Sequence, residues 1–469
     1  MFGAGHIVVV DLGFGDAGKG ATVDWLCAPE ADLEVAAVVR FNGGAQAAHN
    51  VVADGRHHTF AQFGAGTFHG VPTLLSRHML VEPIALAAES GQLAALGVRD
   101  PLGLLAVDGR ALLTTPIHIA ANRAREDARG SSRHGSCGRG IGETAWYALE
   151  HDAPTVADCR TPDVLRAKLD RLAAHYDELI GPSAHGYESI DALVAMYGDF
   201  AGAVRITDDG ELARTAARGR LVFEGAQGVL LDEWRGFHPH TTWSTVEPRH
   251  ARAMIAGIGG AATVLGVTRT YMTRHGAGPL PTEAPLGNPE PHNGTGPYQG
   301  AFRQGHLDPI LLRYAIEVCG GIDGLVVNHL DVPGTLCAAA AYDTGAGIVT
   351  DLIPGRWRDL EHQHRLTDQL SEATPILEPV HGDPADWLAD RLRVLVALTG
   401  HGPDRRDRVA RDESAFGGAS TPAPVEPVGH GLDRRERIVR LEPPLARAQR
   451  TACRWARTAA SRLPNSPHE

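Results

Sequence analysis

A glycine-rich turn near the beginning of the chain contains the residues best suited to binding a phosphate group. The turn reads Gly-Phe-Gly-Asp-Ala-Gly-Lys-Gly over residues 13–20 and follows the β-branched run 8–10. Its backbone N–H groups and the ammonium of Lys19 can bind phosphate oxygens at the start of the next helix. The spacing is that of a P-loop, except that Gly20 stands where a serine or threonine normally binds Mg²⁺. We therefore expect the carboxylate of Asp16 to bind the metal in a P-loop-like turn.

Three further polar side chains follow other strand-like runs. His49 closes a loop that opens with a double glycine, and its imidazole can donate to a phosphoryl oxygen. Gln227 lies in a glycine turn, and its amide can pair with the amide or lactam edge of a substrate. Asp331 ends an Asn-His-Leu-Asp motif with the spacing of a guanine-binding motif, since its carboxylate can accept from the N1–H and 2-amino groups. Each of these residues, taken alone, also fits a structural or surface role.

Two further glycine-rich loops are weaker indications of a functional site. The first, over residues 136–142, contains Cys137 and Arg139. No base lies beside Cys137 in the sequence, so the pattern does not indicate a nucleophile, and the loop fits a surface turn equally well. The second, over residues 273–283, is by itself typical of an irregular loop.

The elements that must position these side chains alternate between strand-like and helix-like patterns. Helices are expected to begin near Pro83, Pro116 and Pro162, because proline suits a first helical turn. The alternation predicts an α/β fold with a large, mostly parallel central sheet, helices on both faces and inserted subdomains. The predicted strands are residues 7–10, 36–41, 221–223, 262–267, 325–328 and 394–398. Ligands bind at the carboxyl ends of such strands, so one edge is expected to gather Asp16, His49, Glu224 and Asp331.

Composition restricts the class of protein. The chain has 469 residues and a formal net charge of −12, which argues against nucleic acid as the main partner because phosphate binding needs a basic face. Its six cysteines form no CxxC pair, which fits a reducing cytoplasm rather than a disulfide scaffold or a zinc ribbon. We expect neither a secretion signal nor a membrane span, since no apolar run approaches the roughly 20 residues that a span needs.

Composition also divides the chain. We expect one large domain over residues 1–405 and a low-complexity tail over residues 406–469. Within the tail, residues 414–431 are rich in Gly, Pro, Ala and Ser, which is typical of a linker. Residues 445–463 have the pattern of an Arg-rich amphipathic helix.

Taken together and in this order, the motifs resemble the adenylosuccinate synthetase family. The family's Gly-Asp-Glu-Gly-Lys-Gly turn reads Gly-Asp-Ala-Gly-Lys-Gly here, and its Phe-Glu-Gly-Ala-Gln-Gly segment is unchanged. The resemblance extends over residues 5–405 and is dense up to residue 331. The matching segments are residues 15–20, 40–49, 223–232, 273–283, 329–331 and 402–405.

The resemblance implies a GTP-dependent ligase with a two-step reaction. In the family, GTP phosphorylates the 6-oxygen of IMP, and the amino group of aspartate then displaces the phosphate to form a C–N bond. The resemblance assigns Asp16 as base and Mg²⁺ ligand, Lys19 to the β- and γ-phosphates, and His49 as donor to the transferring group. It also assigns Gln227 to the amide edge of the substrate and the backbone carbonyl of Ala48 to Mg²⁺. The residues it places at the nucleotide are Gly15, Gly18, Lys19, Gly20, His329, Asp331, Gly402 and Pro403.

The substrate side departs from the family pattern. The family holds the IMP 5′-phosphate with an asparagine, two threonines and an arginine of the partner subunit. At the matching positions this chain has Gln46, Cys137 and, approximately, Glu247 and His151, while Arg139 and Arg249 replace part of the lost charge. The loop that holds aspartate has several arginines in the family and one here. Substrate contacts are therefore expected from Gln46, Cys137, Arg139, Gln227 and Arg303.

Three functions fit these patterns. We favour a diverged ligase that uses GTP and Mg²⁺ to phosphorylate a purine-type or other amide carbonyl and then adds an amine, with substrates changed from IMP and aspartate. The second is the ordinary enzyme of AMP biosynthesis with an altered phosphate pocket. The third is a GTP-binding regulator without activity, which the presence of Asp16, Lys19 and His49 disfavours. The resemblance also implies a cytoplasmic homodimer.

Overall fold

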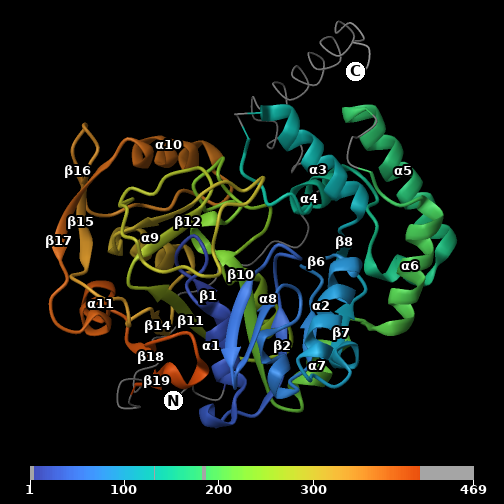
Figure 1. Cartoon of the computed structure of the whole chain (residues 1–469), viewed down its shortest axis with the longest axis horizontal. Coiled ribbons are helices and arrows are strands. Elements are labelled where there is room, and N and C mark those ends of the chain that lie inside the picture. The colour runs from blue at the N-terminus through green and yellow to red at the C-terminus, as the bar shows by residue number, and fades with distance from the viewer. Residues whose placement is uncertain (1–4, 131–132, 182–185, 412–469) are drawn as a thin grey trace, which may run out of the picture.

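A ten-stranded sheet forms the centre of the protein. Figure 1 shows this arrangement in a computed structural model. The model describes residues 5–130, 133–181 and 186–411. Its neighbouring strands are parallel, except that β18 and β19 are antiparallel. In order across the sheet, the strands are β19 (Arg408–Ala410), β18 (Val396–Gly400), β14 (Gly324–Asn328), β11 (Ala262–Arg269), β1 (His6–Asp11), β10 (Arg220–Gly228), β2 (Val35–Arg40), β5 (Thr73–Leu75), β7 (Leu105–Asp108) and β9 (Arg205–Thr207).

Helices and small sheets surround this centre. The α-helices are α1 (Lys19–Cys27), α2 (Pro83–Ala95), α3 (Pro116–Arg129), α4 (Ile141–Glu150), α5 (Pro162–Ile180), α6 (Ile190–Ala203), α7 (Gly210–Ala216), α8 (Arg249–Gly257), α9 (Pro309–Val318), α10 (Leu360–Ser371) and α11 (Pro384–Leu392). The smaller sheets pair β3 (His49–Ala53) with β4 (Arg56–Phe60), β6 (Leu80–Val81) with β8 (Leu112–Leu113), β12 (Met272–His275) with β13 (Phe302–Gly305), and β15 (Cys337–Asp343) with β16 (Ile348–Val349) and β17 (Thr374–Pro379).

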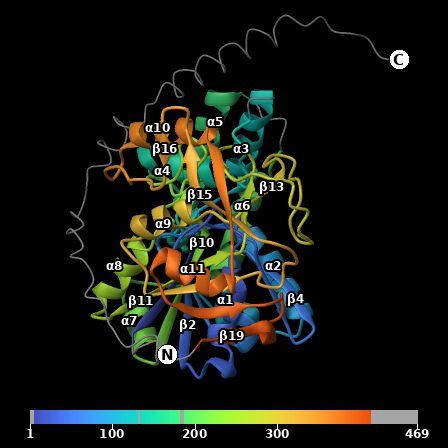
Figure 2. The same ribbon diagram turned by 90° about the vertical axis from the view of Figure 1, so that its left-hand side faces the viewer.

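Two hydrophobic cores lie on the two faces of the sheet. Side chains alternate along a strand, so Ile7 and Val9 of β1 enter one core while Val8 and Val10 enter the other. The first core contains side chains of α1, α2, α3, α5 and α6, and the second contains side chains of α8, α9, α10 and α11. In Figure 2, α8 and α9 lie to the left of the central strands and α2 lies to the right. Because both faces are covered, the strands are continuous apolar runs, and polar groups concentrate where the strands end.

The predicted α/β fold is confirmed. All six predicted strands are present, and α2, α3 and α5 begin at the three predicted prolines. The sheet continues past residue 405, because β19 pairs with β18. The expected linker over residues 414–431 and the expected helix over residues 445–463 lie outside the described residues. None of the described helices is both long and apolar enough to cross a bilayer.

Candidate functional site

The carboxylate of Asp11, at the end of β1, holds the glycine-rich turn from the inside. Asp11 is fully buried and accepts from the backbone N–H groups of Gly13 and Ala17, at 2.8 and 2.9 Å. The ammonium of Lys19, the first residue of α1, lies 3.0 Å from the same carboxylate. A buried charge is tolerated when it is paired and hydrogen-bonded in this way, so Asp11 determines both the loop shape and the lysine position. Asp11 was not among the predicted site residues, although it ends a buried strand directly before the turn.

Close contacts explain why two positions of the turn are glycine. Gly18 has a φ of +96°, and a Cβ there would lie 2.6 Å from the amide nitrogen of Asn328. That nitrogen donates to the carbonyl oxygen of Ala17 at 2.7 Å and ties the turn to the end of β14. A Cβ on Gly20 would lie 2.7 Å from the Cβ of His49. The turn therefore lacks the serine or threonine of a P-loop because His49 occupies the space that such a side chain would need.

Asp16 presents a partly exposed carboxylate at the tip of the turn. Its backbone has a φ of 60°, and its carboxylate lies 3.3 Å from Nε2 of His275 on β12. Burial would raise the pKa of Asp16, but the hydrogen bond with His275 and the charges of Lys19 and Arg269 outweigh it and lower the pKa. Asp16 is therefore ionised at neutral pH, and a carboxylate oxygen suits both a base and a Mg²⁺ ligand. His275 was not among the site residues predicted from the sequence, although it lies in the 273–283 loop.

His49 is oriented by a buried carboxylate. Nδ1 of His49 lies 2.6 Å from Oε1 of Glu224 on β10, whose other oxygen accepts from the N–H of Ala65 at 3.0 Å. Burial and the nearby charge of Arg40 lower the pKa of His49. Among the described residues, Nε2 of His49 is buried and has no hydrogen-bond partner. Such a pair fixes the ring and leaves Nε2 available to a ligand, as the predicted role of His49 requires.

Two glutamines also carry unpaired amide atoms. Oε1 of Gln227 and both amide atoms of Gln46 are buried, and the described residues provide no hydrogen-bond partner for them. Gln227 has a φ of 60°, and a Cβ on the neighbouring Gly43 would lie 3.3 Å from its Oε1. Asn42 braces this turn, since its amide bonds both the N–H and the carbonyl of Ala226, at 2.8 and 3.0 Å. Buried polar atoms usually have a partner, so these amides are available to a ligand.

The residues expected at the guanine base lie at the ends of two neighbouring strands. The N–H of Leu330 donates to the carbonyl of Gly400 at 3.0 Å, which joins the segment after β14 to the segment after β18. This contact brings the turn of Gly402 and Pro403 beside the motif that ends at Asp331. His329 has a φ of 58°, and burial lowers its pKa to about 3, so the ring is neutral. Asp331 is exposed, and its carboxylate is therefore accessible to a base.

Aromatic rings cover the glycine-rich loop before α4. A Cβ on Gly138 would lie 2.8 Å from the ring of Tyr298, and one on Gly142 would lie 3.0 Å from the indole of Trp243. Burial raises the pKa of the Cys137 thiol in this loop, so a reactive thiolate is disfavoured. The side chain of Arg139 is exposed. The loop therefore offers aromatic rings, a neutral thiol and the exposed guanidinium of Arg139 where the sequence pattern predicted contacts to a substrate.

The guanidinium of Arg303 is occupied by its own surroundings. It donates to the backbone carbonyls of Gly276 and Gly278, at 3.0 and 2.8 Å, and to the carboxylate of Glu283 at 2.6 Å. Arg249 likewise pairs with Glu247 at 2.7 Å and stacks over the ring of Trp357. In this arrangement both arginines hold parts of the protein together.

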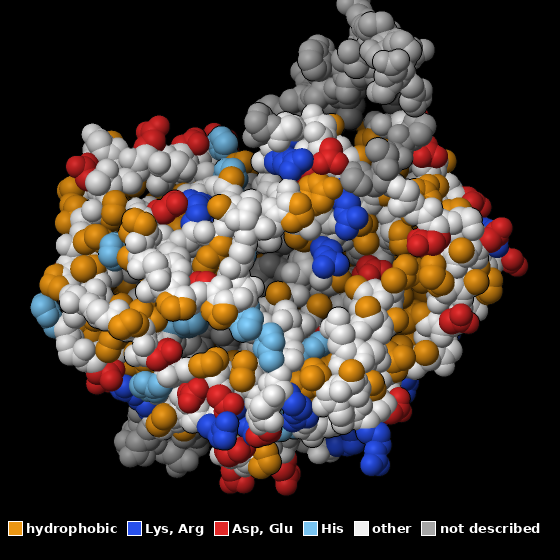
Figure 3. Space-filling model, in the orientation of Figure 1, with side chains coloured by type: hydrophobic (Ala, Val, Ile, Leu, Met, Phe, Trp, Pro, Cys, Tyr) orange, Lys and Arg blue, Asp and Glu red, His pale blue; other side chains and the backbone are white. Residues whose placement is uncertain are grey.

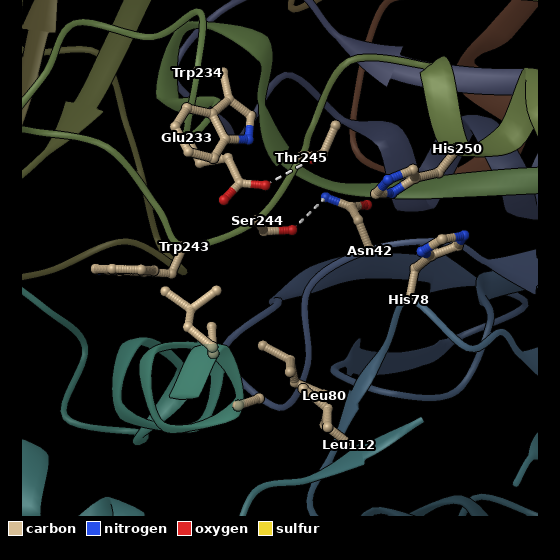
Figure 4. Close-up of a pocket in the computed structure, with 13 residues that line it drawn as sticks. Asn42, His78, Leu80, Leu112, Glu233, Trp234, Trp243, Ser244, Thr245 and His250 are labelled. Carbon is tan, nitrogen blue, oxygen red and sulfur yellow. Dashed lines mark hydrogen bonds between the residues drawn. The ribbon is translucent and has the colours of Figure 1, made fainter. Parts of the chain in front are cut away.

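A cavity of about 140 Å³ lies beside the turn that Asn42 braces. Figure 3 shows that this face of the molecule is hollowed near its centre, and Figure 4 shows the side chains that line the cavity. They come from the segment after β2, from β6 and the residues before it, from β8 and α4, and from the segment between β10 and α8 together with the first turn of α8.

A family model described as adenylosuccinate synthetase matches residues 8–375. Among curated relatives, an adenylosuccinate synthetase of Neisseria meningitidis serogroup A is 32% identical over 432 residues, which cover 87% of this chain and 98% of the relative. One from Neisseria gonorrhoeae is 31% identical over 431 residues, with the same shares of the two chains.

Two solved structures share the fold. Fully ligated adenylosuccinate synthetase from Plasmodium falciparum superposes with a TM-score of 0.72 at 19% identity, over 87% of this chain and all of that one. Cyanophage S-2L succinoaminodeoxyadenylate synthetase, bound to dGMP and to dATP as an energy donor, has a TM-score of 0.54 at 19% identity, over 86% of this chain and 94% of that one.

Proposed function

Because this chain belongs to the adenylosuccinate synthetase family of GTP-dependent ligases, which form C–N bonds with GTP and Mg²⁺, we propose that it phosphorylates an amide-type carbonyl oxygen and then adds an amine. We further propose that its acceptor and its amine differ from IMP and aspartate. The observation that carries the proposal is the combination of Asp16, His49–Glu224 and Lys19–Asp11, which retains charged and oriented groups for phosphoryl transfer.

Each of these side chains has a part in the first step. Gln227 holds the amide edge of the acceptor, and Asp16 takes the proton that leaves the acceptor as its oxygen attacks the γ-phosphoryl group. Lys19 transfers its contact from Asp11 to the phosphates and neutralises charge there. Nε2 of His49 donates to an oxygen of the transferring group in the imidazolium form, which the phosphate charge favours and in which Nδ1–H stays bonded to Glu224. In the second step, the amine nitrogen attacks the carbon that bears the phosphorylated oxygen, inorganic phosphate leaves with that oxygen, and the amine releases one proton.

The residues proposed to hold Mg²⁺ fit a hard cation. Asp16 is ionised and partly exposed, and the backbone carbonyl of Ala48 lies one residue before His49. When bound, Mg²⁺ would neutralise phosphate charge and favour the γ-phosphoryl transfer.

Changed substrates are supported by the acceptor side of the site. Tyr298 and Trp243 cover the glycine loop, and Arg249 is engaged by Glu247. The cyanophage relative, bound to dGMP and dATP, indicates that proteins of this fold do not all take the same nucleotides. The ordinary reaction with IMP and aspartate is the second candidate, favoured by the 32% identity to the Neisseria enzyme. A cytoplasmic homodimer remains part of this proposal.

The test supplies GTP and Mg²⁺ with IMP and aspartate, and separately with panels of nucleosides, bases and amines. GDP release and a mass increase of the acceptor are measured. We expect GDP formation that depends on both an acceptor and an amine other than the IMP–aspartate pair. Efficient turnover of IMP with aspartate would instead establish the ordinary enzyme, and absence of GDP formation with every pair would contradict the proposed ligase.

A further inference from the structure

The cavity beside Asn42 has a lining unsuited to a phosphate group. None of the described residues that line it is a lysine or an arginine, and its one carboxylate belongs to Glu233. His78 and His250 form one wall as a stacked pair with ring centroids 3.8 Å apart. Burial lowers the pKa of His78 to about 2, so this imidazole adds no positive charge. A dianionic phosphate would therefore lose its hydration in the cavity without gaining a cation.

The rest of the lining is apolar and aromatic. Trp234 is 5% exposed and Trp243 is 39% exposed, so the first forms a buried wall and the second stands at the rim. Aliphatic side chains form the opposite wall, as Figure 4 shows for Leu80 and Leu112, and α4 contributes Leu149 beside them. The volume of about 140 Å³ is close to that of an apolar protein cavity of roughly 150 Å³ that binds benzene. One six-membered ring is thus the size of group that the cavity accepts.

Hydroxyl and amide groups line the part of the cavity formed by Ser244 and Asn42. The hydroxyl of Ser244 accepts from the amide of Asn42 at 3.3 Å and from the N–H of Gly43 at 3.2 Å. A Cβ placed on Gly43 would lie within 3.4 Å of the amide of Gln227. The hydroxyl of Thr245 donates to Glu233 at 2.7 Å. Gly43 thus lies between the amide of Gln227 and the Ser244 part of the cavity, which places Gln227 one residue away from the lining.

We propose that this cavity binds an uncharged ring of the acceptor, such as an unphosphorylated sugar, so that the acceptor is a nucleoside-like molecule rather than a nucleotide. The inference rests on the proposed function, because it takes Gln227 as the residue that holds the reacting carbonyl. Trp243 stacks on the ring from the rim, Trp234 and the aliphatic wall exclude water, and the Ser244–Asn42 end bonds the hydroxyl groups.

Calorimetric titration of the full-length protein with inosine and with IMP tests the proposal without turnover. We expect inosine to bind at least about tenfold more tightly than IMP, because only IMP must bury a dianion. Trp243→Ala should weaken inosine binding by about tenfold and leave GTP binding unchanged. Trp146→Ala is the matched control, since Trp146 lies on α4 but contacts Arg125 and His175 instead of the cavity.

A second pair of probes tests the cavity without a purine base. Benzyl alcohol should bind in the wild-type protein and compete with inosine, whereas benzyl phosphate should not. Leu149→Arg, which adds a cation to the lining, should shift the preference toward IMP. Tighter binding of IMP than of inosine, or no binding of either neutral probe, would overturn the proposal. The separate GDP assay decides the ligase function. A ligase that prefers IMP would contradict the cavity proposal and the proposed change of acceptor, while the ligase activity itself would stand.

Discussion

The proposed nucleotide side and the proposed acceptor side of the site differ in the charge of their side chains. On the nucleotide side, charged groups are held by partners of opposite charge: Lys19 by Asp11 at 3.0 Å, and Asp16 by His275 at 3.3 Å. On the acceptor side, Trp243 and Tyr298 lie against glycines. The cavity beyond them has neither lysine nor arginine among its described lining residues.

This difference fits two separate tasks, which are phosphoryl transfer on the nucleotide side and recognition of the acceptor on the other side. Phosphoryl transfer moves charge between oxygens, so it needs fixed charges at fixed positions, and those positions are built on strand ends and a glycine turn. Recognition of the acceptor depends on the shape and polarity of its distal part, which loops can change without touching the reacting groups. The acceptor side can therefore diverge while the nucleotide side remains complete.

The largest effect is expected from Asp16→Asn. The amide keeps the shape of the side chain but removes both the base and the anionic metal ligand, so GDP release should fall by about 10³-fold. The measurement is steady-state GDP formation, with thermal unfolding as a check that the fold is intact. Unchanged turnover in a folded variant would show that this carboxylate is not catalytic. The charged groups around the glycine-rich turn could then no longer be assigned to phosphoryl transfer.

Glu224→Gln should have the next largest effect. Glu224 lies 2.6 Å from His49 and positions its ring, so the amide should reduce kcat by about 100-fold and change the KM for GTP little. Rapid-quench or steady-state kinetics separate these parameters. A rise in the KM for GTP with kcat unchanged would instead indicate that Glu224 only shapes the nucleotide site.

Asp331→Asn tests whether the nucleotide side recognises guanine. If the exposed carboxylate accepts from guanine, the variant should lose about tenfold of the preference for GTP over ATP. Titrations with both nucleotides measure this ratio, and Asp368→Asn on α10, which also carries an exposed carboxylate, is the control. Full retention of the GTP preference would place guanine recognition elsewhere.

Arg303→Gln tests the acceptor side. Because the guanidinium bonds two backbone carbonyls and Glu283, we expect the free energy of unfolding to fall by about 2 kcal/mol and the KM for the amine to stay unchanged. Urea unfolding and amine-dependent GDP release measure the two quantities. A large rise in the amine KM at unchanged stability would restore Arg303 to the amine-binding role that the sequence pattern predicts.

Much of the fold and of the nucleotide side follows from local sequence signals. The β-branched runs, the first-turn prolines and the glycine turn depend on neighbouring residues, so they can be recognised without knowledge of distant contacts. The roles of Asp16, Lys19 and His49 came from motifs of the same local kind, and Glu224 was expected at the same edge because it follows a predicted strand.

The contacts that make these residues into a site were decided by the tertiary structure. Asp16 meets His275, and Ala17 is tied to Asn328, across more than half of the chain. The cavity joins Leu80, Leu149 and Trp243 from three separate segments. No local pattern encodes such pairings, because they arise only when parallel strands bring distant loops to one edge of a sheet. The sequence by itself thus determined the glycine-rich turn and the family of ligases, while packing decided which partners hold each charge and what shape the cavity has.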